Sequence, residues 1–191
     1  MKLAEEFYIQ EDVVTLAKAL LGKRLCTNID GKLTSGIITE TEAYAGETDK
    51  ASHAYGGKRT ARTEMMFARG GVAYVYLCYG IHSLFNVVTN VKNVPHAVLI
   101  RAIKPQDGME IMLDRSGKTK LRKADSVGPG KISKLLGIHF KDSGESLLAD
   151  RIWIEETDIM IKDSDISVSK RIGIDYAEED ADLPYRFELK D

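Results

Sequence analysis

Two acidic residues stand out in the segment 37–44, which otherwise has the composition of a strand. A strand has a side-chain period of two, so Glu40, Glu42 and Tyr44 should project from one face. One interpretation is a solvated strand edge. The other is a carboxylate at the mouth of a pocket, where partial burial leaves it usable as a general base. The segment taken alone favours neither interpretation.

A second group of chemically active side chains follows in the segment 52–62. It combines a histidine, an aromatic residue, a Gly-Gly pair and three cations. Glycine lets the backbone come close to a ligand, and guanidinium and ammonium groups suit phosphate oxygens. The combination favours nucleic-acid binding over a plain solvated loop. The side chains concerned are His53 and the three cations Lys58, Arg59 and Arg62.

Tyrosines are concentrated in the segment 72–80. Tyr74 and Tyr76 share one face of an expected strand, and a place in the core is the default for Tyr74. Tyr79 falls at a tight turn before Gly80, where it has no core to fill and could insert between base pairs. In the following strand, Asn86 lies between apolar neighbours. It is either a structural hydrogen-bonding residue or, if it faces a pocket, a reader of a base edge.

Arg101 and the segment 126–134 place cations in contexts where a charged side chain is unusual or could bind a ligand. Arg101 lies inside the apolar run 97–103 and is not expected to be buried without a partner, for which Glu42 is the obvious candidate. The segment 126–134 opens a helix with glycines and lysines, including Gly130 and Lys131. A helix start binds phosphate well, although Gly-Pro before a helix is also ordinary punctuation. This segment lacks the P-loop pattern.

The net charge is −2, which is unusual for a DNA-binding domain, but the charges are unevenly distributed. Residues 50–71 hold five cations and one acid (+4), and residues 115–134 hold seven cations and one acid (+6). The acids of residues 175–182 compensate. This asymmetry suggests one face that binds a polyanion and an acidic back, while solvated surface loops remain the alternative.

Several classes of protein are disfavoured by what the sequence lacks. The apolar runs are too short to span a bilayer and the first residues contain no secretory h-region, so we expect a cytoplasmic or nucleoid protein. Cys26 and Cys78 suggest reduced, buried thiols. The motifs of zinc deaminases, nucleophile-elbow hydrolases and zincins are absent, and the four histidines show no ligand spacing. We therefore expect neither a metal nor a cofactor.

The elements that must position these residues form a single α+β domain over residues 1–191. Helical spacing marks Glu11–Leu21, which Gly22 closes, and a turn at Asp30-Gly31 joins two strands into a hairpin. We expect an antiparallel sheet with flanking helices. The expected strands are 24–28, 33–42, 72–78, 84–90, 97–103, 151–155 and 159–162, and the further helical segments are 64–67, 108–113 and 131–136.

In combination, these motifs resemble the alkyladenine (3-methyladenine) DNA glycosylase family from about residue 8 to the C-terminus. The segments that carry the resemblance are 40–44, His53 with 56–62, 66–67, 74–76 with 79–80, Asn86, 99–102, 128–132, 171–174 and 184–187. The resemblance implies a curved antiparallel sheet with a protruding hairpin. It also implies excision of alkylated purines, hypoxanthine and ethenoadenine without a metal. Ala61 and Gly130 stand where many relatives have proline and serine, which leaves the fine substrate preference open.

The resemblance also implies a role for each site residue. Glu42 would deprotonate the attacking water, which Arg101 and the main chain near residues 171–173 would hold. Tyr79 would fill the gap left by the extruded nucleotide, and Asn86 would clash with the 2-amino group of guanine. Tyr44, His53 and Tyr76 would line the pocket for the base, while Lys58, Arg59, Arg62, Gly130 and Lys131 would contact the DNA backbone.

Water as the nucleophile, with no lysine in the pocket motifs, predicts a monofunctional enzyme without strand cleavage. The expected partner is duplex DNA that contains damaged purines, and the expected state is a monomer. Two other hypotheses remain. A non-catalytic damaged-DNA-binding domain would keep the cations and Tyr79 without needing Glu42 beside Arg101. A metal-dependent hydrolase would use Glu40, Glu42 and His53.

Overall fold

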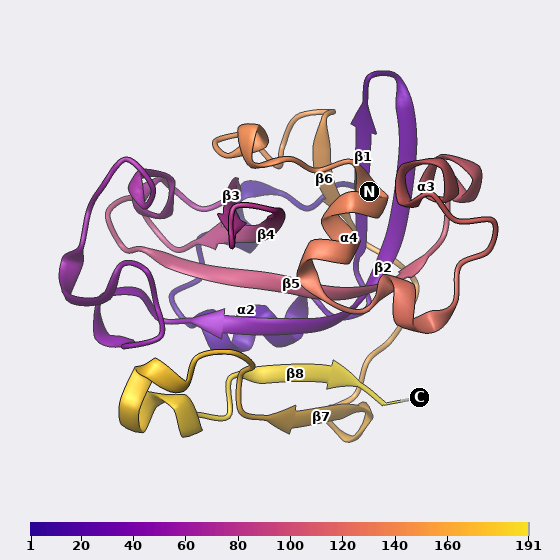
Figure 1. Cartoon of the computed structure of the whole chain (residues 1–191). Helices are drawn as coiled ribbons and strands as arrows, with labels where there is room; N and C mark the ends of the chain where they lie inside the picture. Colours follow the sequence, from indigo (N-terminus) through magenta and orange to yellow (C-terminus); the bar gives the residue numbers. More distant parts are fainter. Residues whose placement is uncertain (191) are drawn as a thin grey trace.

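In the computed structural model, which describes residues 1–190, the chain forms one sheet whose strand pairings are all antiparallel. The strand order is β3-β4-β5-β2-β1-β6, and β8 joins β2 and carries β7 (Figure 1). The expected α+β class is confirmed. The strands are β1 Arg24–Ile29, β2 Lys32–Tyr44, β3 Val72–Cys78, β4 His82–Thr89, β5 His96–Pro105, β6 Ile152–Glu155, β7 Ile166–Ser169 and β8 Arg186–Leu189.

Helices flank this sheet: α1 Glu5–Tyr8, α2 Val13–Ala19, α3 Met109–Ser116 and α4 Pro129–Leu136. The expected helix at 11–21 is confirmed but shorter. It starts after Asp12, whose carboxylate accepts hydrogen bonds from the Val14 amide (2.9 Å) and the Thr15 hydroxyl (2.5 Å). Proline occupies the first position of α4, where its missing N–H costs nothing.

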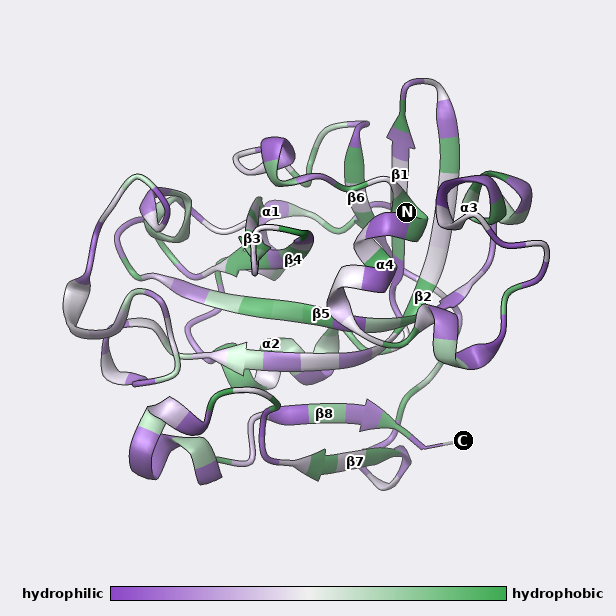
Figure 2. Ribbon diagram, viewed as in Figure 1, coloured by the Kyte–Doolittle hydropathy of each residue, from purple (hydrophilic) through white to green (hydrophobic). Residues whose placement is uncertain are grey.

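Alternation along the central strands produces two different faces. One face of β2, β3, β4 and β5, here called the core face, packs with α2, whose Ala17 carbonyl accepts a hydrogen bond from the Thr41 hydroxyl (2.9 Å). Figure 2 shows the hydrophobic colouring of β5 in the middle of the sheet. The buried residues of the core face are Ala43, Ala73, Val75, Phe85, Val87, Val98 and Ile100.

Two hairpin turns are made by residue pairs with positive φ at both positions. Asp30 and Gly31 have φ of 55° and 72°, and Tyr79 and Gly80 have φ of 53° and 69°. These pairs suit the tight turns that match the twist of antiparallel strands. The first turn confirms the hairpin expected at Asp30-Gly31. The second projects Tyr79 from the end of β3, with its side chain 91% exposed.

The expectation for the segment 159–162 is wrong, because no strand forms there. Ile159 and Met160 are 48% and 88% exposed, whereas Ile161 packs against the core. The segment 159–162 is therefore a connection between β6 and β7, anchored by one apolar side chain, and it makes no strand pairing. Conversely, α1, β7 and β8 have four residues each and were not expected. Elements this short depend on their tertiary partners and have little periodicity of their own.

Both cysteines are free thiols, as expected: Cys26 is buried and Cys78 is partly buried. Burial raises the pKa of the Cys26 thiol to about 12, so this sulfur stays protonated and unreactive at neutral pH. Within residues 1–190, none of the helices has the length and apolar character that a membrane crossing requires.

Candidate active site

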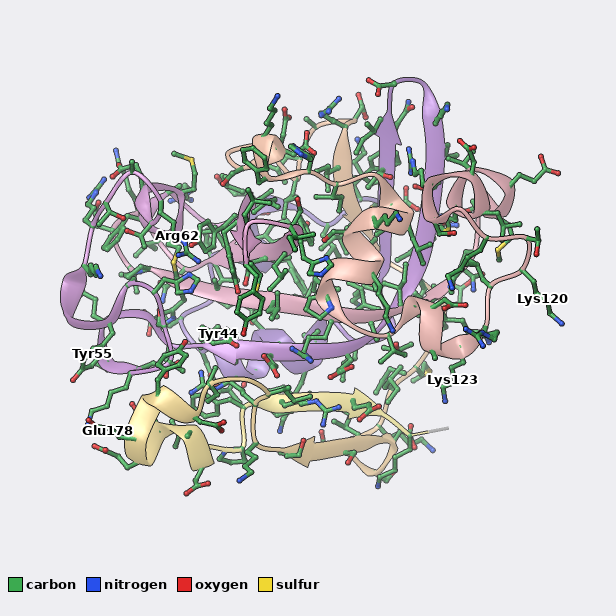
Figure 3. All side chains as sticks on the ribbon, in the orientation of Figure 1. Tyr44, Tyr55, Arg62, Lys120, Lys123 and Glu178 are labelled. Atoms are coloured by element: carbon green, nitrogen blue, oxygen red, sulfur yellow. The ribbon has the colours of Figure 1, made fainter. Side chains whose placement is uncertain are left out.

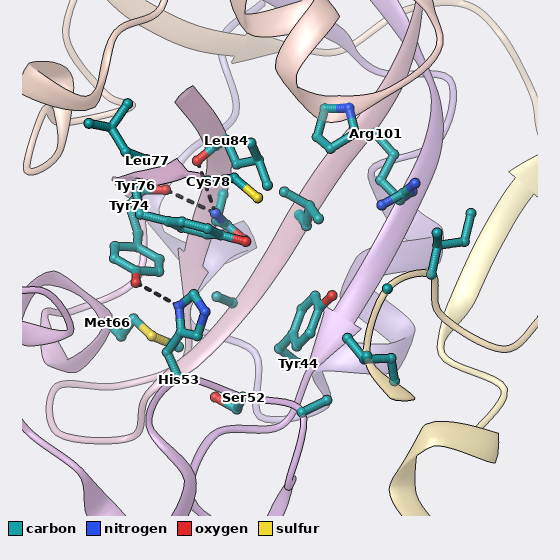
Figure 4. Close-up of a pocket in the computed structure, with 18 of the residues that line it drawn as sticks. Tyr44, Ser52, His53, Met66, Tyr74, Tyr76, Leu77, Cys78, Leu84 and Arg101 are labelled. Carbon is teal, nitrogen blue, oxygen red and sulfur yellow. Dashed lines mark hydrogen bonds between the residues drawn. The ribbon is translucent and has the colours of Figure 1, made fainter. Parts of the chain in front are cut away.

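The face of the sheet opposite the core face, here called the pocket face, carries a row of side chains across four strands. Tyr74 pairs with Asn86, Asn86 with Leu99, and Leu99 with Glu42, so all four side chains project on the same side. Tyr74, Asn86 and Leu99 line a pocket of about 450 Å³, into which Figure 4 looks. Glu42 lies directly behind the pocket wall, in contact with the lining residues Tyr44, Arg101 and Ile172. Further walls come from the end of β3, from the loop after β2, from Pro129 at the start of α4 and from the segment 172–176 before β8.

Glu42 is fully buried and held by hydrogen bonds on both carboxylate oxygens. The Tyr44 hydroxyl donates to Oε2 (2.8 Å), and the Ile172 amide donates to Oε1 (2.8 Å). Tyr44 reaches Glu42 because residues two apart on a strand share a face. The solvated-edge interpretation of this segment is therefore wrong: β2 lies between β5 and β1 in the sheet.

Burial raises the pKa of Glu42 above its ordinary value of 4.5. The Arg101 guanidinium, the Ile172 amide and the Tyr44 hydroxyl oppose this effect, while the negative charge of Glu40 reinforces it. A carboxylate that is partly desolvated yet still ionisable is a stronger proton acceptor than one in water. The electrostatics thus suit a general base.

Arg101 lies close to Glu42, as expected, but its shorter contact is with Glu40. Its Nε is 3.4 Å from Glu42 Oε1 and donates to Glu40 Oε1 at 2.9 Å. The pairing of β2 with β5 is irregular at Glu40, which pairs with Ala102 while Thr41 pairs with Ile100. Arg101 therefore has no directly paired residue on β2, and its side chain contacts both Glu40 and Glu42. Glu40 also accepts from Arg186 Nε on β8 (2.6 Å). Glu40 is thus a buried member of an ion-pair network.

Aromatic rings form the other side of the pocket. His53 Nδ1 and the Tyr74 hydroxyl are 2.9 Å apart, and the His53 ring meets that of Tyr76 edge to face at 4.6 Å. Tyr74 is buried, as its default assignment to the core expected, but its hydroxyl fixes His53 (Figure 4). The sequence-predicted pocket residues Tyr44, His53, Tyr76 and Asn86 are thus brought together.

Two of these pocket residues have defined hydrogen-bonding states. Burial, with Arg62 and Lys58 nearby, lowers the pKa of His53 to about 4, so its imidazole is neutral at pH 7. The Asn86 amide nitrogen donates to the main-chain oxygens of Tyr74 (3.1 Å) and Leu84 (3.3 Å). These bonds orient the Asn86 side chain within the pocket wall.

Sequence reasoning missed the residues that hold the pocket together from behind. The Arg171 guanidinium lies 4.8 Å from the centre of the Tyr44 ring and makes a buried, two-point ion pair with Asp49 (2.5 and 2.9 Å). This pair ties the loop after β2 to the segment that carries the Ile172 amide. The resemblance marked only the main chain at 171–173, and nothing local to Asp49 indicated its partner.

The predicted backbone-contacting cations of the first basic segment differ in their surroundings. Lys58 and Arg62 line a second hollow of about 540 Å³ beside the pocket, and Arg62 lies over the Tyr76 ring at 5.0 Å. Arg59 instead makes a two-point ion pair with Glu64 (2.8 and 2.6 Å). In Figure 3, Arg62 and Lys123 lie on opposite sides of Tyr44. The first basic segment lines the pocket through Arg62, and the second adjoins it through Pro129.

Gly130 and Lys131 lie in the first turn of α4, next to the pocket. A Cβ at Gly130 would come within 2.9 Å of the His82 side chain, so glycine allows α4 to approach β4 closely. The Lys131 ammonium donates to the Ala124 carbonyl (2.8 Å). Pro129, directly before them, lines the pocket together with Arg101.

The acidic residues near the C-terminus do not form the expected acidic back. Lys50 makes ion pairs with Glu178 and Glu179, and the Asp180 carboxylate accepts from the Lys50 amide (2.8 Å). Tyr176, in the same segment, lines both hollows. The acidic segment therefore sits at the rim of the site, because its charges pair with a cation of the first basic segment.

The site residues are not arranged as metal ligands. In the described part of the chain, no group of three or more His, Cys, Asp or Glu side chains is placed to hold a metal ion. The Glu40 and Glu42 carboxylates face guanidinium and amide donors, while His53 is bonded to Tyr74. This geometry gives no support to a hydrolase whose metal is held by Glu40, Glu42 and His53.

Comparison with known proteins agrees with this geometry. Residues 6–191 match the family model described as methylpurine-DNA glycosylase (MPG). A Chlamydia felis protein is 50% identical over 98% of this chain and 95% of its own length. Proteins of Bacillus cereus (strain G9842) and Clostridium perfringens are 47% and 45% identical over 100% of this chain and 96% and 97% of their own lengths. All three bear the name "Putative 3-methyladenine DNA glycosylase". The chain belongs to the methylpurine-DNA glycosylase family.

Proposed function

We propose that this chain is a monofunctional DNA glycosylase that extrudes a damaged purine nucleotide from the duplex and hydrolyses its N-glycosidic bond with water activated by Glu42. The observation that carries the proposal is the buried Glu42 carboxylate, which contacts three residues of the wall of an aromatic pocket: Tyr44, Ile172 and Arg101. A non-catalytic DNA-binding domain would have no need for a base with a raised pKa.

The pocket walls suit a flat, extruded base. Extrusion from the stack costs a few kcal/mol, and stacking on an aromatic ring returns about 1–3 kcal/mol per base. Tyr44 and Tyr76 offer ring faces, and neutral His53 adds no repulsion against a cationic alkylated purine. The exposed Tyr79 at the β3–β4 turn fills the gap left in the duplex.

The reaction needs only water and the side chains present. As the bond from C1′ to the purine nitrogen breaks, the base leaves with the bonding electrons and the sugar becomes oxocarbenium-like. Water then attacks C1′ while its proton passes to Glu42, and the anionic carboxylate stabilises the developing positive charge. None of the described residues that line the pocket is a lysine, so no Schiff base forms and the product is an abasic site.

The substrate range follows from the leaving group and the pocket wall. Purines methylated at N3 or N7 are cationic, leave readily as neutral bases and attract tyrosine faces. Hypoxanthine and ethenoadenine enter the same pocket as neutral bases, so they leave as anions unless they gain a proton, and water is the proton source that the reaction supplies. Asn86, fixed by two main-chain carbonyls, would obstruct the 2-amino group of guanine. 7-Methylguanine carries the same 2-amino group, so its excision depends on its cationic leaving group, which an undamaged guanine lacks.

The proposed partner is duplex DNA, bound by a monomer that works in the cytoplasm or on the nucleoid. Lys58, Arg59, Arg62 and Lys131 lie on segments that adjoin the pocket, and Gly130 at the start of α4 adds its main-chain N–H group. Electrostatic binding of this kind weakens with salt, and log K falls by about 0.9 per phosphate neutralised.

A lesion panel tests the proposal. Purified protein is incubated with duplexes that contain 7-methylguanine, hypoxanthine, ethenoadenine or guanine, with EDTA present, and released bases are measured. We expect release of damaged purines and alkali-labile sites, with no cleavage before alkali and no borohydride-trapped complex. Binding without release would favour the non-catalytic domain. If EDTA abolished the release of purines, the hypothesis of a metal-dependent hydrolase would be favoured instead.

A further inference from the structure

We propose that Glu40 and Arg186 are positioning residues: Arg186 fixes Glu40, and Glu40 holds Arg101 by its Nε, so that the terminal amino groups of Arg101 stay in the pocket and do not close on Glu42, the proton acceptor. This inference rests on the proposed function, which assigns proton transfer to Glu42. It concerns two residues that make no contact with the reacting atoms.

The geometry of Arg101 carries the argument. Its Nε lies between two carboxylates, 2.9 Å from Glu40 Oε1 and 3.4 Å from Glu42 Oε1. Within residues 1–190, the hydrogen bond that Arg101 donates is made by Nε, while its side chain lines the pocket. Figure 4 shows the guanidinium at the edge of the cavity. Glu40 thus anchors the inner end of the guanidinium and leaves the outer end to the ligand.

The charges of Glu40, Glu42, Arg101 and Arg186 are largely buried, so they must compensate one another. The Glu40 and Glu42 side chains are 2% and 0% exposed, and those of Arg101 and Arg186 are 11% and 20% exposed. The four buried or mostly buried members, two carboxylates and two guanidiniums, sum to zero, and Arg186 also pairs with the half-exposed Glu188 at the outer end of the network (3.1 Å). Buried charges are tolerated only when they are paired and hydrogen-bonded, so removal of one charge forces the others to regroup.

The direction of regrouping differs between the two residues. Without the Glu40 charge, Arg101 has only Glu42 as a carboxylate partner. Its guanidinium should then move toward Glu42 and form a direct ion pair with this carboxylate. Without Arg186, Glu40 is paired with Arg101 alone and should draw Arg101 away from Glu42. The two substitutions should therefore move the basicity of Glu42 in opposite directions.

The surroundings of Glu42 define which pH effects belong to it. From β2 it faces the Tyr44 hydroxyl and Glu40, from β5 Arg101 and from β8 Arg186. From the segment before β8 it faces the Ile172 amide, the Arg171 guanidinium and Tyr176. Burial raises the pKa of Glu42, Arg101 lowers it and Glu40 raises it. Loss of Glu40 should lower this pKa, and loss of the Arg186 charge should raise it.

Two variants and two readouts test the proposal. Glu40→Gln and Arg186→Gln are prepared with ¹³C-labelled glutamate, and the Glu42 carboxyl resonance, assigned with Glu42→Gln, is titrated with pH. Single-turnover excision of 7-methylguanine is then measured over the same pH range. Glu155→Gln is the matched control, because Glu155 is a strand carboxylate paired with an arginine, Arg24, on the β1–β6 side of the sheet.

We expect Glu40→Gln to shift the Glu42 titration and the acid limb of the rate to lower pH. It should also reduce the plateau rate on the order of 10²-fold, as for a misplaced catalytic group. Arg186→Gln should shift both to higher pH, and Glu155→Gln should leave both unchanged. Arg186 is partly exposed, so its variant remains informative if Glu40→Gln does not fold.

Unchanged titration of Glu42 in both variants, or shifts in the same direction, would overturn the proposal. A loss of rate with an unaltered pH profile would show that Glu40 only supports the fold, which also overturns it. The NMR titration does not depend on turnover. A wild-type protein that releases no purine would therefore refute the proposed function while leaving the Arg101 arrangement testable.

Discussion

Phe85 and Asn86 are neighbours on β4, yet they point to opposite faces of the sheet and meet opposite surroundings. Phe85 is fully buried in the apolar core, where packing alone satisfies it. Asn86 is nearly as buried but is fixed by hydrogen bonds to two carbonyls and lies in the wall of the pocket. The same strands thus supply stability from one side and chemistry from the other.

The difference between the two faces extends to charge. The core-face residues named above carry no charge, whereas the pocket face buries Glu40 and Glu42. Because the folded-state pKa of Glu42 is raised, its favourable contribution to stability is present below the unfolded-state pKa and is lost as pH rises through the folded-state value. The ionised base therefore opposes folding at neutral pH. Function at this site is supported by stability gained on the core face.

The largest effect expected on the pocket face is that of Glu42→Gln. Glutamine keeps the volume but cannot accept a proton from water, so single-turnover excision should fall by roughly 10²–10⁴-fold. Thermal unfolding at pH 7 should show no loss of stability, because a buried charge has been removed. A variant that excises within a few-fold of the wild type would exclude Glu42 as the base.

The next effect belongs to the core face. Phe85→Ala should lower the free energy of unfolding by about 3–5 kcal/mol, as measured by urea denaturation, because it removes buried surface and leaves a cavity. Excision by the folded fraction in the cold should stay within a few-fold of the wild type. Phe85→Leu is the control and should cost less than about 1.5 kcal/mol. A loss of excision without a loss of stability would show that the two faces are not separable.

The smallest effect is expected at the exposed β3–β4 turn, which belongs to neither face. Tyr79→Ser should weaken binding to an abasic-site duplex by about 1 kcal/mol, roughly fivefold, through loss of one stacking ring. Tyr79→Phe keeps the ring and should bind like the wild type. Since the side chain is 91% exposed, both variants should unfold like the wild type. Equal binding by all three proteins would rule out insertion of Tyr79.

Local pattern in the sequence was enough to predict the sheet where the strands are long. The alternation in β2 placed Glu42 and Tyr44 on one face, and the paired positive-φ turn at Asp30-Gly31 fixed a hairpin. The strand expected at 159–162 failed because apolar content without a pairing partner does not make a ladder. The four-residue strands β7 and β8 form through that pairing, which no local pattern records.

The sequence was enough to predict the residues of the site, but not the buried ion pairs that hold them in place. Glu42, Arg101 and the pocket aromatics follow from unusual residue types in strand or loop contexts, aided by the resemblance. The Asp49–Arg171 pair and the Glu40–Arg186 pair join residues 122 and 146 positions apart. Contacts at such separation depend on tertiary structure, and the individual charges look like ordinary surface residues in the sequence. The acidic segment 175–182 was expected on the face away from the site for the same reason: its ion pairs with Lys50 depend on tertiary structure.

The most direct test of the central claim, that ionised Glu42 activates the water, is the pH dependence of single-turnover 7-methylguanine excision. This base is already cationic and needs no acid, so the acid limb isolates the general base, once spontaneous release has been subtracted. We predict that the rate falls as pH decreases through one ionisation above the ordinary glutamate value of 4.5, and that this limb is absent from the residual rate of Glu42→Gln. An acid limb that persists unchanged in Glu42→Gln would contradict the account.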